Sequence, residues 1–328
     1  MTRVLVLGGT GFVGPFIVRQ LLEDGHDVTM FHRGHREPPE TEGAEHVHAE
    51  FARLPEYVSR LSRRKPEMVM DVSPGVGKGG HGVLHFAGVA DRGVVLTSMD
   101  VYRAMSVLRG LSEKRQPMPV TEESALREEP LPDLPPDLAF DNLTVEQAVH
   151  TRADFPVSVL RCPFIYGPLD TKRRLRDYVR RMRDRRPAIV LDQRFAGLRW
   201  SRGYVENVAA AAVAAVSDDR AAGRTYNVAE PDALTEPEWI RAIADAFGWD
   251  GRVVVSEPDA LPPDLRVPLP GRQDLFADTS RIRDELGYQE RVVRGDGLAR
   301  AIEWELSQSG GDSPPDYSAE DSFLASLL

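Results

Sequence analysis

The chain has 328 residues, of which 41 are basic and 51 acidic, so its net charge at neutral pH is −10. This charge disfavours nucleic-acid binding, because phosphates would be repelled overall, and an apolar content of 41 % excludes wholesale disorder. No apolar run approaches the ~20 residues of a membrane span, no signal-peptide pattern precedes the first expected strand, and the single cysteine excludes a disulfide framework. We therefore expect a cytoplasmic protein of one large domain or two modest ones, without membrane association.

The first half of the chain alternates short β-branched runs with helical patterns. Helices are expected at about 12–25 and 141–152. Strands are expected at residues 3–9, 26–33, 66–73, 92–98 and 157–162. This alternation is typical of βαβ units around a parallel sheet. It predicts an α/β Rossmann fold, a doubly wound parallel sheet with helices on both faces, followed by a smaller C-terminal α/β lobe.

The pattern changes in the second half. We expect an Arg-rich helix at about 172–186, an Ala-rich helix at 206–217 and an amphipathic helix at 235–247. Short strands are expected at 188–191, 224–230 and 252–257. We divide the chain into a dinucleotide-binding domain (1–161), a substrate-binding lobe (162–305), from which the chain is free to cross back into the sheet, and a tail (306–328). The tail is either mobile or docked.

The Arg-rich segment is locally basic, but its charges wrap most of the helix circumference. The buried stripe is expected to consist of Leu175, Tyr178, Val179 and Met182. The simplest interpretation is a solvated helix; a surface that binds anions or RNA is the alternative.

The stretch "VLVLGGTGFVG" carries the strongest motif. Gly8, Gly11 and Gly14 directly follow a buried strand and open a helix. Glycine allows a tight turn and a close approach of the backbone to a pyrophosphate, which the free N–H groups of the helix N-terminus attract. The motif predicts a dinucleotide site, and Thr10, Phe12 and Val13 complete its loop.

The end of the second expected strand bears on the choice of dinucleotide. An NAD site places a carboxylate there, whereas this chain has His32, followed by Arg33 and Arg36. A guanidinium pairs well with the extra phosphate of NADP. The sequence therefore favours NADP over NAD, unless both arginines are ordinary solvated charges. Glu50 is a candidate contact to the adenine edge.

These residues resemble the extended or atypical short-chain dehydrogenase/reductase superfamily, in its NAD-dependent epimerase/dehydratase branch. The combination of "GGTGFVG", "FHRG" and "SMDVYRA" is most similar to the branch that includes the chloroplast stem-loop-binding-like proteins. The resemblance covers residues from about 3 to about 305. Its further motifs are "VVLTSMDVYRA", "VLRCPFIYGPLD", "GYVENVAAAAVAAV" and "GRQDLFADTSRIRDELGY".

In this family a serine, a tyrosine and a lysine carry the chemistry. The resemblance maps the serine to Ser98, but Phe140 stands in the tyrosine position and Thr144 in the lysine position. No Tyr-x-x-x-Lys pair exists anywhere in the chain. A phenylalanine donates no proton, so another group does this work or the reaction needs none.

Ser98 is the first candidate catalytic residue, followed by Tyr102 and Tyr166. Two acids near the start of the helix at 141–152, Asp141 and Glu146, are more often helix caps or dipole partners than catalysts.

The resemblance also implies a substrate site in the second half of the chain. Arg272 matches an arginine with which relatives hold a sugar-nucleotide diphosphate; Arg199 and Arg202 are further candidates, as is Phe140 beside the reacting centre. For each arginine a structural ion pair is an equally good interpretation. No group of His, Cys and acidic residues has metal-ligand spacing, so the sequence predicts no metal.

Three functions follow from these observations. The first is an NADP-binding epimerase or reductase that acts on a small polar or sugar-like carbonyl or alcohol, with nucleotide sugars included, through a rearranged proton relay. The second is a scaffold that catalyses a non-redox step such as elimination, isomerisation or cyclisation. The third is a non-catalytic dinucleotide- or RNA-binding protein. By resemblance we expect a homodimer whose interface includes the helix near 141–152.

Overall fold

The computed structural model describes residues 1–72, 82–132, 141–308 and 313–327. Its largest element is a seven-stranded parallel sheet in the order β11-β6-β5-β4-β1-β2-β3. The strands are β1 (Arg3–Leu7), β2 (Asp27–His32), β3 (Glu45–His48), β4 (Met68–Asp71), β5 (Arg92–Ser98), β6 (Val157–Cys162) and β11 (Thr225–Asn227). The strand β11 brings the chain back into the sheet from the second half of the sequence.

Both faces of the sheet are buried, which explains why its strands are almost continuously apolar. On β1, Val4 and Val6 belong to one core cluster, whereas Leu5 and Leu7 belong to another, as the period of two in a strand requires. The first face is covered by α1 (Gly14–Glu23) and α7 (Val205–Ser217), and the second by α2 (Leu54–Ser62) and α4 (Asn142–His150). The prediction of a doubly wound parallel sheet is confirmed.

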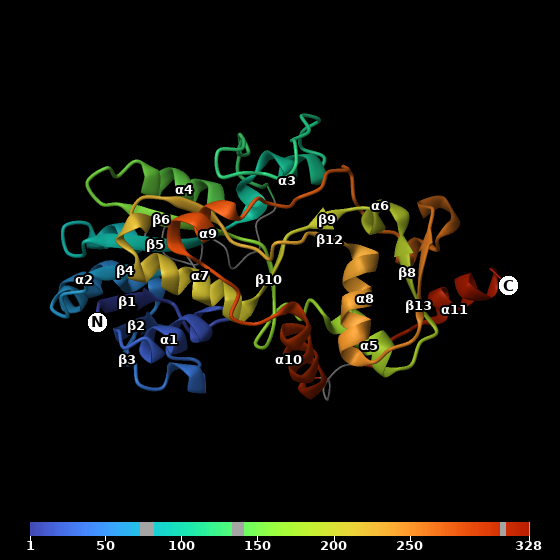
Figure 1. The fold of residues 1–328 in the computed structure, drawn as a ribbon, viewed down its shortest axis with the longest axis horizontal. Helices are drawn as coiled ribbons and strands as arrows, with labels where there is room; N and C mark the ends of the chain where they lie inside the picture. The colour runs from blue at the N-terminus through green and yellow to red at the C-terminus, as the bar shows by residue number, and fades with distance from the viewer. Residues whose placement is uncertain (73–81, 133–140, 309–312, 328) are drawn as a thin grey trace.

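A second lobe extends from the sheet towards the other end of the elongated molecule (Figure 1). Its helices are α5 (Arg176–Arg183), α6 (Gln193–Ala196), α8 (Glu236–Phe247), α10 (Arg294–Ser307) and α11 (Ser318–Ala325). Its strands pair two by two: β8 (Ala188–Asp192) with β13 (Arg252–Ser256), β7 (Phe164–Tyr166) with β10 (Arg202–Tyr204), and β9 (Arg199–Trp200) with β12 (Leu234–Thr235). The helix α9 (Ser280–Leu286) packs beside the sheet against β11 and α7, and α3 (Arg103–Leu108) follows β5 after a short turn.

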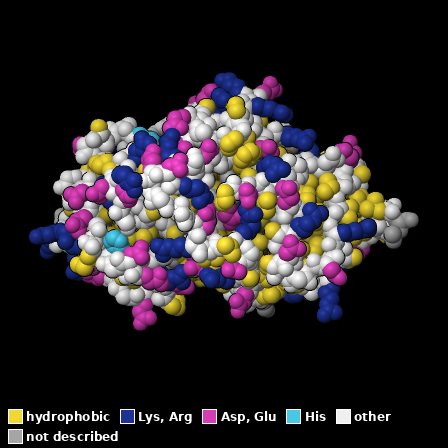
Figure 2. All heavy atoms as spheres, viewed as in Figure 1, with side chains coloured by type: hydrophobic (Ala, Val, Ile, Leu, Met, Phe, Trp, Pro, Cys, Tyr) yellow, Lys and Arg dark blue, Asp and Glu magenta, His cyan; other side chains and the backbone are white. Residues whose placement is uncertain are grey.

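The Arg-rich helix α5 is shorter than its sequence pattern predicts. Arg173 and Arg185 have φ angles of 47° and 52°, in the left-handed region that ends an α-helix on either side. Leu175, Val179 and Met182 are buried as expected. Most arginines of this segment pair with nearby acids, and Arg180 donates to the Ser313 carbonyl, so the helix is a solvated and largely neutralised face. Figure 2 shows basic and acidic side chains interspersed over one face of the molecule.

The C-terminal helix α11 docks on the second lobe. Phe323 packs with Val190 and Leu261, and Glu320 accepts a 2.7 Å hydrogen bond from Arg181 Nε. Within the part of the chain that the structure describes, no helix combines the length and the apolar character needed to cross a bilayer.

Candidate functional site

The glycine loop between β1 and α1 has the shape of a phosphate cradle. Gly8 and Gly9 have φ angles of 99° and 93°, which glycine adopts without steric cost. A Cβ on Gly14 would lie 2.4 Å from Gly9 Cα, so only glycine lets the helix pack this closely against the loop. Gly11 is exposed, and a Cβ there would meet nothing within 4 Å. The backbone at Gly11 is therefore open to a ligand, with half-buried Thr10, Phe12 and Val13 on either side.

His32 ends β2 in the position expected for the ribose-binding acid, but it lies under the surface with 1 % exposure. Its Nδ1 accepts a 3.1 Å hydrogen bond from Gly34 N–H, and its Nε2 lies 2.8 Å from His46 Nδ1. Burial, with neighbouring His46 and His48, lowers the pKa of His32 to about 4. His32 is therefore neutral at neutral pH and offers no charge to a phosphate.

The NADP prediction depends on the two positively charged arginines that follow His32. Arg33 and Arg36 are exposed, and neither forms an ion pair with another described residue. Glu50 is exposed at the start of a short 3₁₀ turn, Phe51–Arg53. These residues remain a predicted cofactor surface.

Ser98, at the carboxyl end of β5, lines a cavity of about 200 Å³ together with Asp100 and Lys172. Ser98 caps the 3₁₀ turn Met99–Val101, and its Oγ accepts a 3.1 Å hydrogen bond from Asp100 N–H. The Ser98 hydroxyl hydrogen is thus left to donate to a ligand oxygen in the cavity.

Asp100 is the group in this cavity best suited to proton transfer, and the sequence pattern did not reveal it. Its side chain is 27 % exposed and accepts hydrogen bonds of 3.1 and 3.2 Å from Asn142 Nδ2. Burial raises the pKa of Asp100 to about 6; Arg127, 3.8 Å away, opposes this shift and Asp141 adds to it. A pKa near 6 allows a carboxyl group to give and take a proton around neutral pH.

Arg127 and Asp141 hold this arrangement together. Arg127 is fully buried at its side chain and pairs with Asp141 at 2.7 Å. It also donates from Nε to the Asp100 carbonyl at 2.6 Å. Asp141 in turn caps α4 by accepting from Leu143 N–H. The pair therefore links the backbone of Asp100 to the start of α4.

Tyr102, the second candidate of the sequence pattern, lies away from this cavity. It is fully buried; its hydroxyl donates to Asn227 Oδ1 at 2.6 Å and accepts from Arg161 Nη1 at 3.0 Å. Burial raises the pKa of Tyr102 to about 12. A phenol with both hydrogen-bonding partners inside the core is a structural group.

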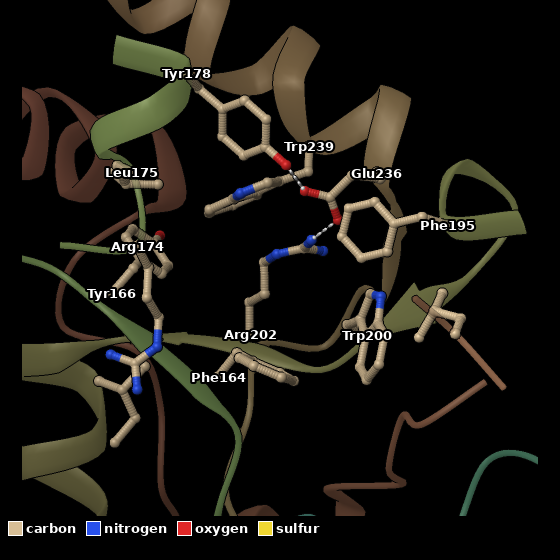
Figure 3. Close-up of a pocket in the computed structure, with 12 residues that line it drawn as sticks. Phe164, Tyr166, Arg174, Leu175, Tyr178, Phe195, Trp200, Arg202, Glu236 and Trp239 are labelled. Carbon is tan, nitrogen blue, oxygen red and sulfur yellow. Dashed lines mark hydrogen bonds and ion pairs between the residues drawn. The ribbon is translucent and has the colours of Figure 1, made fainter. Parts of the chain in front are cut away.

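A larger cavity of about 350 Å³ lies next to the Ser98 cavity, and Phe164 and Arg174 line both. Its wall is mostly aromatic and apolar (Figure 3). The remaining residues of the wall are Ile165, Tyr166, Leu175, Tyr178, Phe195, Trp200, Arg202, Glu236, Trp239 and Leu269. The aromatic side chains come from β7, α5, the segment of α6, β9 and α8, so five separate elements build this cavity.

Three polar groups of the aromatic cavity are paired with one another. Arg202 donates to Glu236 Oε2 at 2.5 Å, and Tyr178 donates its hydroxyl to Glu236 Oε1 at 2.6 Å (Figure 3). The Arg202 guanidinium also lies 4.5 Å from the centre of the Trp239 ring, a cation–π distance. The cavity therefore contains one internally neutralised charge pair, and Arg174, the other arginine of its wall, pairs with Asp170 outside it.

The other candidates of the second half occupy different places. Tyr166 lines the aromatic cavity, and its hydroxyl donates to Glu230 at 2.8 Å; burial raises its pKa above the ordinary value. Arg199 lies on a separate surface, where it donates to the Ala233 carbonyl at 2.7 Å. Arg272 is exposed and does not line either cavity. Phe140 lies outside the described residues.

Arg174 connects the glycine loop to both cavities. Its guanidinium lies 5.9 Å from the centre of the Phe12 ring and pairs with Asp170 at 2.6 Å. The glycine loop, the Ser98 cavity and the aromatic cavity are therefore neighbours around one side chain, although they come from distant parts of the sequence.

Comparisons with known proteins show which proteins the chain resembles. Residues 4–98 match the model of the NAD dependent epimerase/dehydratase family. The chain is 22 % identical to the chloroplast stem-loop binding protein of 41 kDa b of Arabidopsis thaliana, over 99 % of this chain and 85 % of that protein. It is 26 % identical to the 2'-dehydrokanamycin reductase of Streptomyces kanamyceticus, over 75 % of this chain and 67 % of that protein.

Solved structures show the same fold. The UDP-glucose 4-epimerase of Thermotoga maritima, solved with UDP-glucose, has a TM-score of 0.70 at 16 % identity, over 93 % of this chain and 99 % of that one. A UDP-glucose-4-epimerase from Stenotrophomonas maltophila, solved with bound NAD, has a TM-score of 0.69 at 18 % identity, over 95 % and 100 %. The predicted resemblance is confirmed: residues 4–98 match the NAD dependent epimerase/dehydratase family model, and the chain shares its fold with these UDP-glucose 4-epimerases.

Proposed function

We propose that this chain is an NADP-binding reductase or epimerase that acts on the carbonyl or alcohol of a small, uncharged, sugar-like or otherwise ring-shaped substrate. The observation that carries the proposal is that Ser98 and Asp100 line one cavity, which Arg174 connects to the glycine loop and to the aromatic cavity. A reacting oxygen between Ser98 and Asp100 is then close to both a cofactor surface and a substrate surface.

The residues present fit a dinucleotide. The cradle around Gly11 and Gly14 would hold the pyrophosphate, and Arg33 with Arg36 would hold the additional phosphate of NADP. When bound, the nicotinamide supplies the hydride chemistry. We assign the proton chemistry to Asp100. In reduction, protonated Asp100 gives its proton to the substrate oxygen, and in oxidation the carboxylate takes the alcohol proton, while Ser98 donates a hydrogen bond to the same oxygen.

Binding of nicotinamide dinucleotides tests the first part of this proposal. We expect fluorescence titration to show tighter binding of NADPH than of NADH. The double change Arg33→Ala, Arg36→Ala should weaken NADPH by about 1.5–3 kcal/mol per lost charged hydrogen bond and leave NADH unchanged. Arg60→Ala, another exposed arginine, is the control. Failure to bind either dinucleotide would remove the proposed function, whereas binding without turnover on a carbonyl panel would favour the non-redox scaffold.

The pairing of Arg202 with Glu236 suggests which substrates the aromatic cavity accepts. A diphosphate would need a free arginine, but here Glu236 already pairs with the Arg202 guanidinium and cancels its charge. An anion bound through Arg202 would therefore have to break a buried pair. Aromatic walls around a neutral polar pair instead suit an uncharged ring compound.

We therefore expect the fluorescence of Trp200 and Trp239 to respond to phenyl glucoside, an uncharged probe, more strongly than to UDP-glucose. Glu236→Gln removes the competing carboxylate and should shift the preference towards UDP-glucose. A thermal unfolding curve controls for loss of structure in this variant. Tighter binding of UDP-glucose than of the uncharged probe by the unchanged protein would contradict the assignment.

Homodimerisation through the helix α4 region stays a prediction. RNA binding receives no support from α5, since Arg176, Arg181 and Arg183 of this helix each pair with an acid.

A further inference from the structure

Three histidines and one glutamate meet at the carboxyl edge of β2 and β3. We propose that His32, Glu37, His46 and His48 form a binding site for a divalent transition-metal ion of the zinc type. Their candidate ligand atoms all lie within 4.8 Å of one another. Three imidazole nitrogens and one carboxylate oxygen make a four-membered ligand set of the kind that zinc prefers. The excess of nitrogen donors disfavours Mg²⁺ and Ca²⁺, which prefer oxygen.

The parallel pairing of two strands brings these histidines together. His32 on β2 is the register partner of His48 on β3. His46 precedes His48 by two residues and so lies on the same face of β3. Glu37 reaches the group from the loop after β2 and lies 2.6 Å from His48 Nε2 and 3.7 Å from His46 Nδ1. Three of the four ligands are thus placed by strands rather than by loops.

The cluster is already close to the size that a tetrahedral site needs. Zinc–nitrogen bonds of about 2.0–2.1 Å imply neighbouring donor atoms about 3.4 Å apart. The separations here range from 2.6 Å between His48 and Glu37 up to the 4.8 Å limit of the group. Shifts of about 1 Å would therefore convert the hydrogen-bonded cluster into a coordination shell.

The hydrogen bonds around the cluster orient two of the rings. His46 Nε2 faces the Thr41 carbonyl at 3.4 Å, which favours a proton on Nε2 and leaves Nδ1 available as a ligand. His32 Nδ1 instead accepts from Gly34 N–H. Coordination through His32 Nε2 would move the ring proton to Nδ1 and break the hydrogen bond from Gly34. Binding by His32 therefore costs this hydrogen bond, whereas His46 keeps its contact with the Thr41 carbonyl.

The burial of the four side chains leaves one open side. His32 is buried, and the His46 side chain is 19 % exposed, whereas His48 and Glu37 are 50 % and 46 % exposed. An ion can enter past His48 and Glu37 and meet His46 and His32 beneath. Once bound, it would tie the loop after β2, with its exposed arginines, to β3.

Zinc binding by the full-length, tag-free protein tests this proposal. After dialysis against EDTA, the protein is titrated with Zn²⁺ against a chromophoric chelator and, separately, with Co²⁺, whose visible spectrum reports tetrahedral coordination. We expect saturable, stoichiometric binding of both ions without any dinucleotide. His46→Ala and His48→Ala should each weaken zinc by more than the about 10–100-fold typical for loss of an outer-shell partner.

The matched control is His35→Ala, because His35 is exposed on the same loop and lies outside the cluster. His48 is half exposed, so its replacement leaves the core intact and keeps the test valid even where the His46 variant is unstable. Equal zinc binding by the unchanged protein and the His48 variant would overturn the proposal, as would loss of binding in the His35 variant. The titrations contain no dinucleotide, so their outcome does not depend on whether the proposed function is correct.

Discussion

Replacing Asp100 with asparagine is expected to lower kcat by ~10²–10⁴, the contribution of a positioned general acid or base. The amide keeps the shape of the carboxyl group and still accepts a hydrogen bond from Asn142, so the cavity beside Ser98 should keep its form. The affinity for NADPH should not change, because Asp100 is assigned to the reacting oxygen and not to the dinucleotide. The measurement is steady-state kinetics on the best carbonyl of a substrate panel, with NADPH titration of the same samples.

The pH dependence identifies the role of Asp100. Burial raises the pKa of Asp100 to about 6, and the charged groups that act on it are Arg127, which opposes the shift, and Asp141 and Glu146, which add to it. Reduction needs the protonated form, so its rate should fall as pH rises through about 6. Oxidation needs the carboxylate, so its rate should rise over the same interval. Asp100→Asn should remove this pH dependence from both the reduction rate and the oxidation rate.

Tyr102→Phe is the comparison variant. It removes the hydroxyl that joins Asn227 to Arg161, and we expect lower stability but an unchanged pH profile. The assignment of the proton relay to Asp100 would be wrong if Tyr102→Phe lost the change of rate with pH while Asp100→Asn kept it. A carboxyl titration of Asp100 followed by NMR would check its pKa without any substrate.

The elements that sequence reasoning predicted well are those whose signal is local. The strands β1, β2, β4, β5 and β6 stand where their β-branched runs predicted them, because a strand buried on both faces is apolar at most positions. The glycine loop was recognised for the same reason, since its spacing is a property of one contiguous turn. The edge strand β3 was missed because its residues, Glu45–His48, include only one apolar side chain.

The candidate site was harder to predict, because it depends on register and on turns. Tyr102 and Asp100 both follow Ser98 closely, but the 3₁₀ turn Met99–Val101 leaves Asp100 at the cavity and sends Tyr102 into the core. The histidine cluster joins His32 to residues on the next strand, and only the pairing of β2 with β3 brings them into contact. Spacing along the sequence contains no such information.

Breaking a buried ion pair next to Ser98 is expected to cause the largest loss of stability. Glu146 and Arg161 are 1 % and 3 % exposed, and Glu146 accepts three hydrogen bonds from the guanidinium, at 2.7, 3.1 and 3.1 Å. Glu146 Oε1 also accepts from Thr97 Oγ1 at 2.7 Å, one residue before Ser98. The pair therefore joins α4, β5 and β6 beneath the candidate active site.

Glu146→Gln should lower the free energy of unfolding by about 3–5 kcal/mol, because it leaves Arg161 as an unpaired charge in the core. Urea denaturation measures the loss, and Asp154→Asn, which breaks a solvent-exposed pair with Arg152, is the control that should change nothing measurable. The double variant Glu146→Leu, Arg161→Met should recover part of the stability, since apolar residues of similar size replace a buried pair at little cost. If the double variant is as unstable as the sum of its single changes, the loss arises from the separate hydrogen bonds of Thr97 and Tyr102 and not from an orphaned charge.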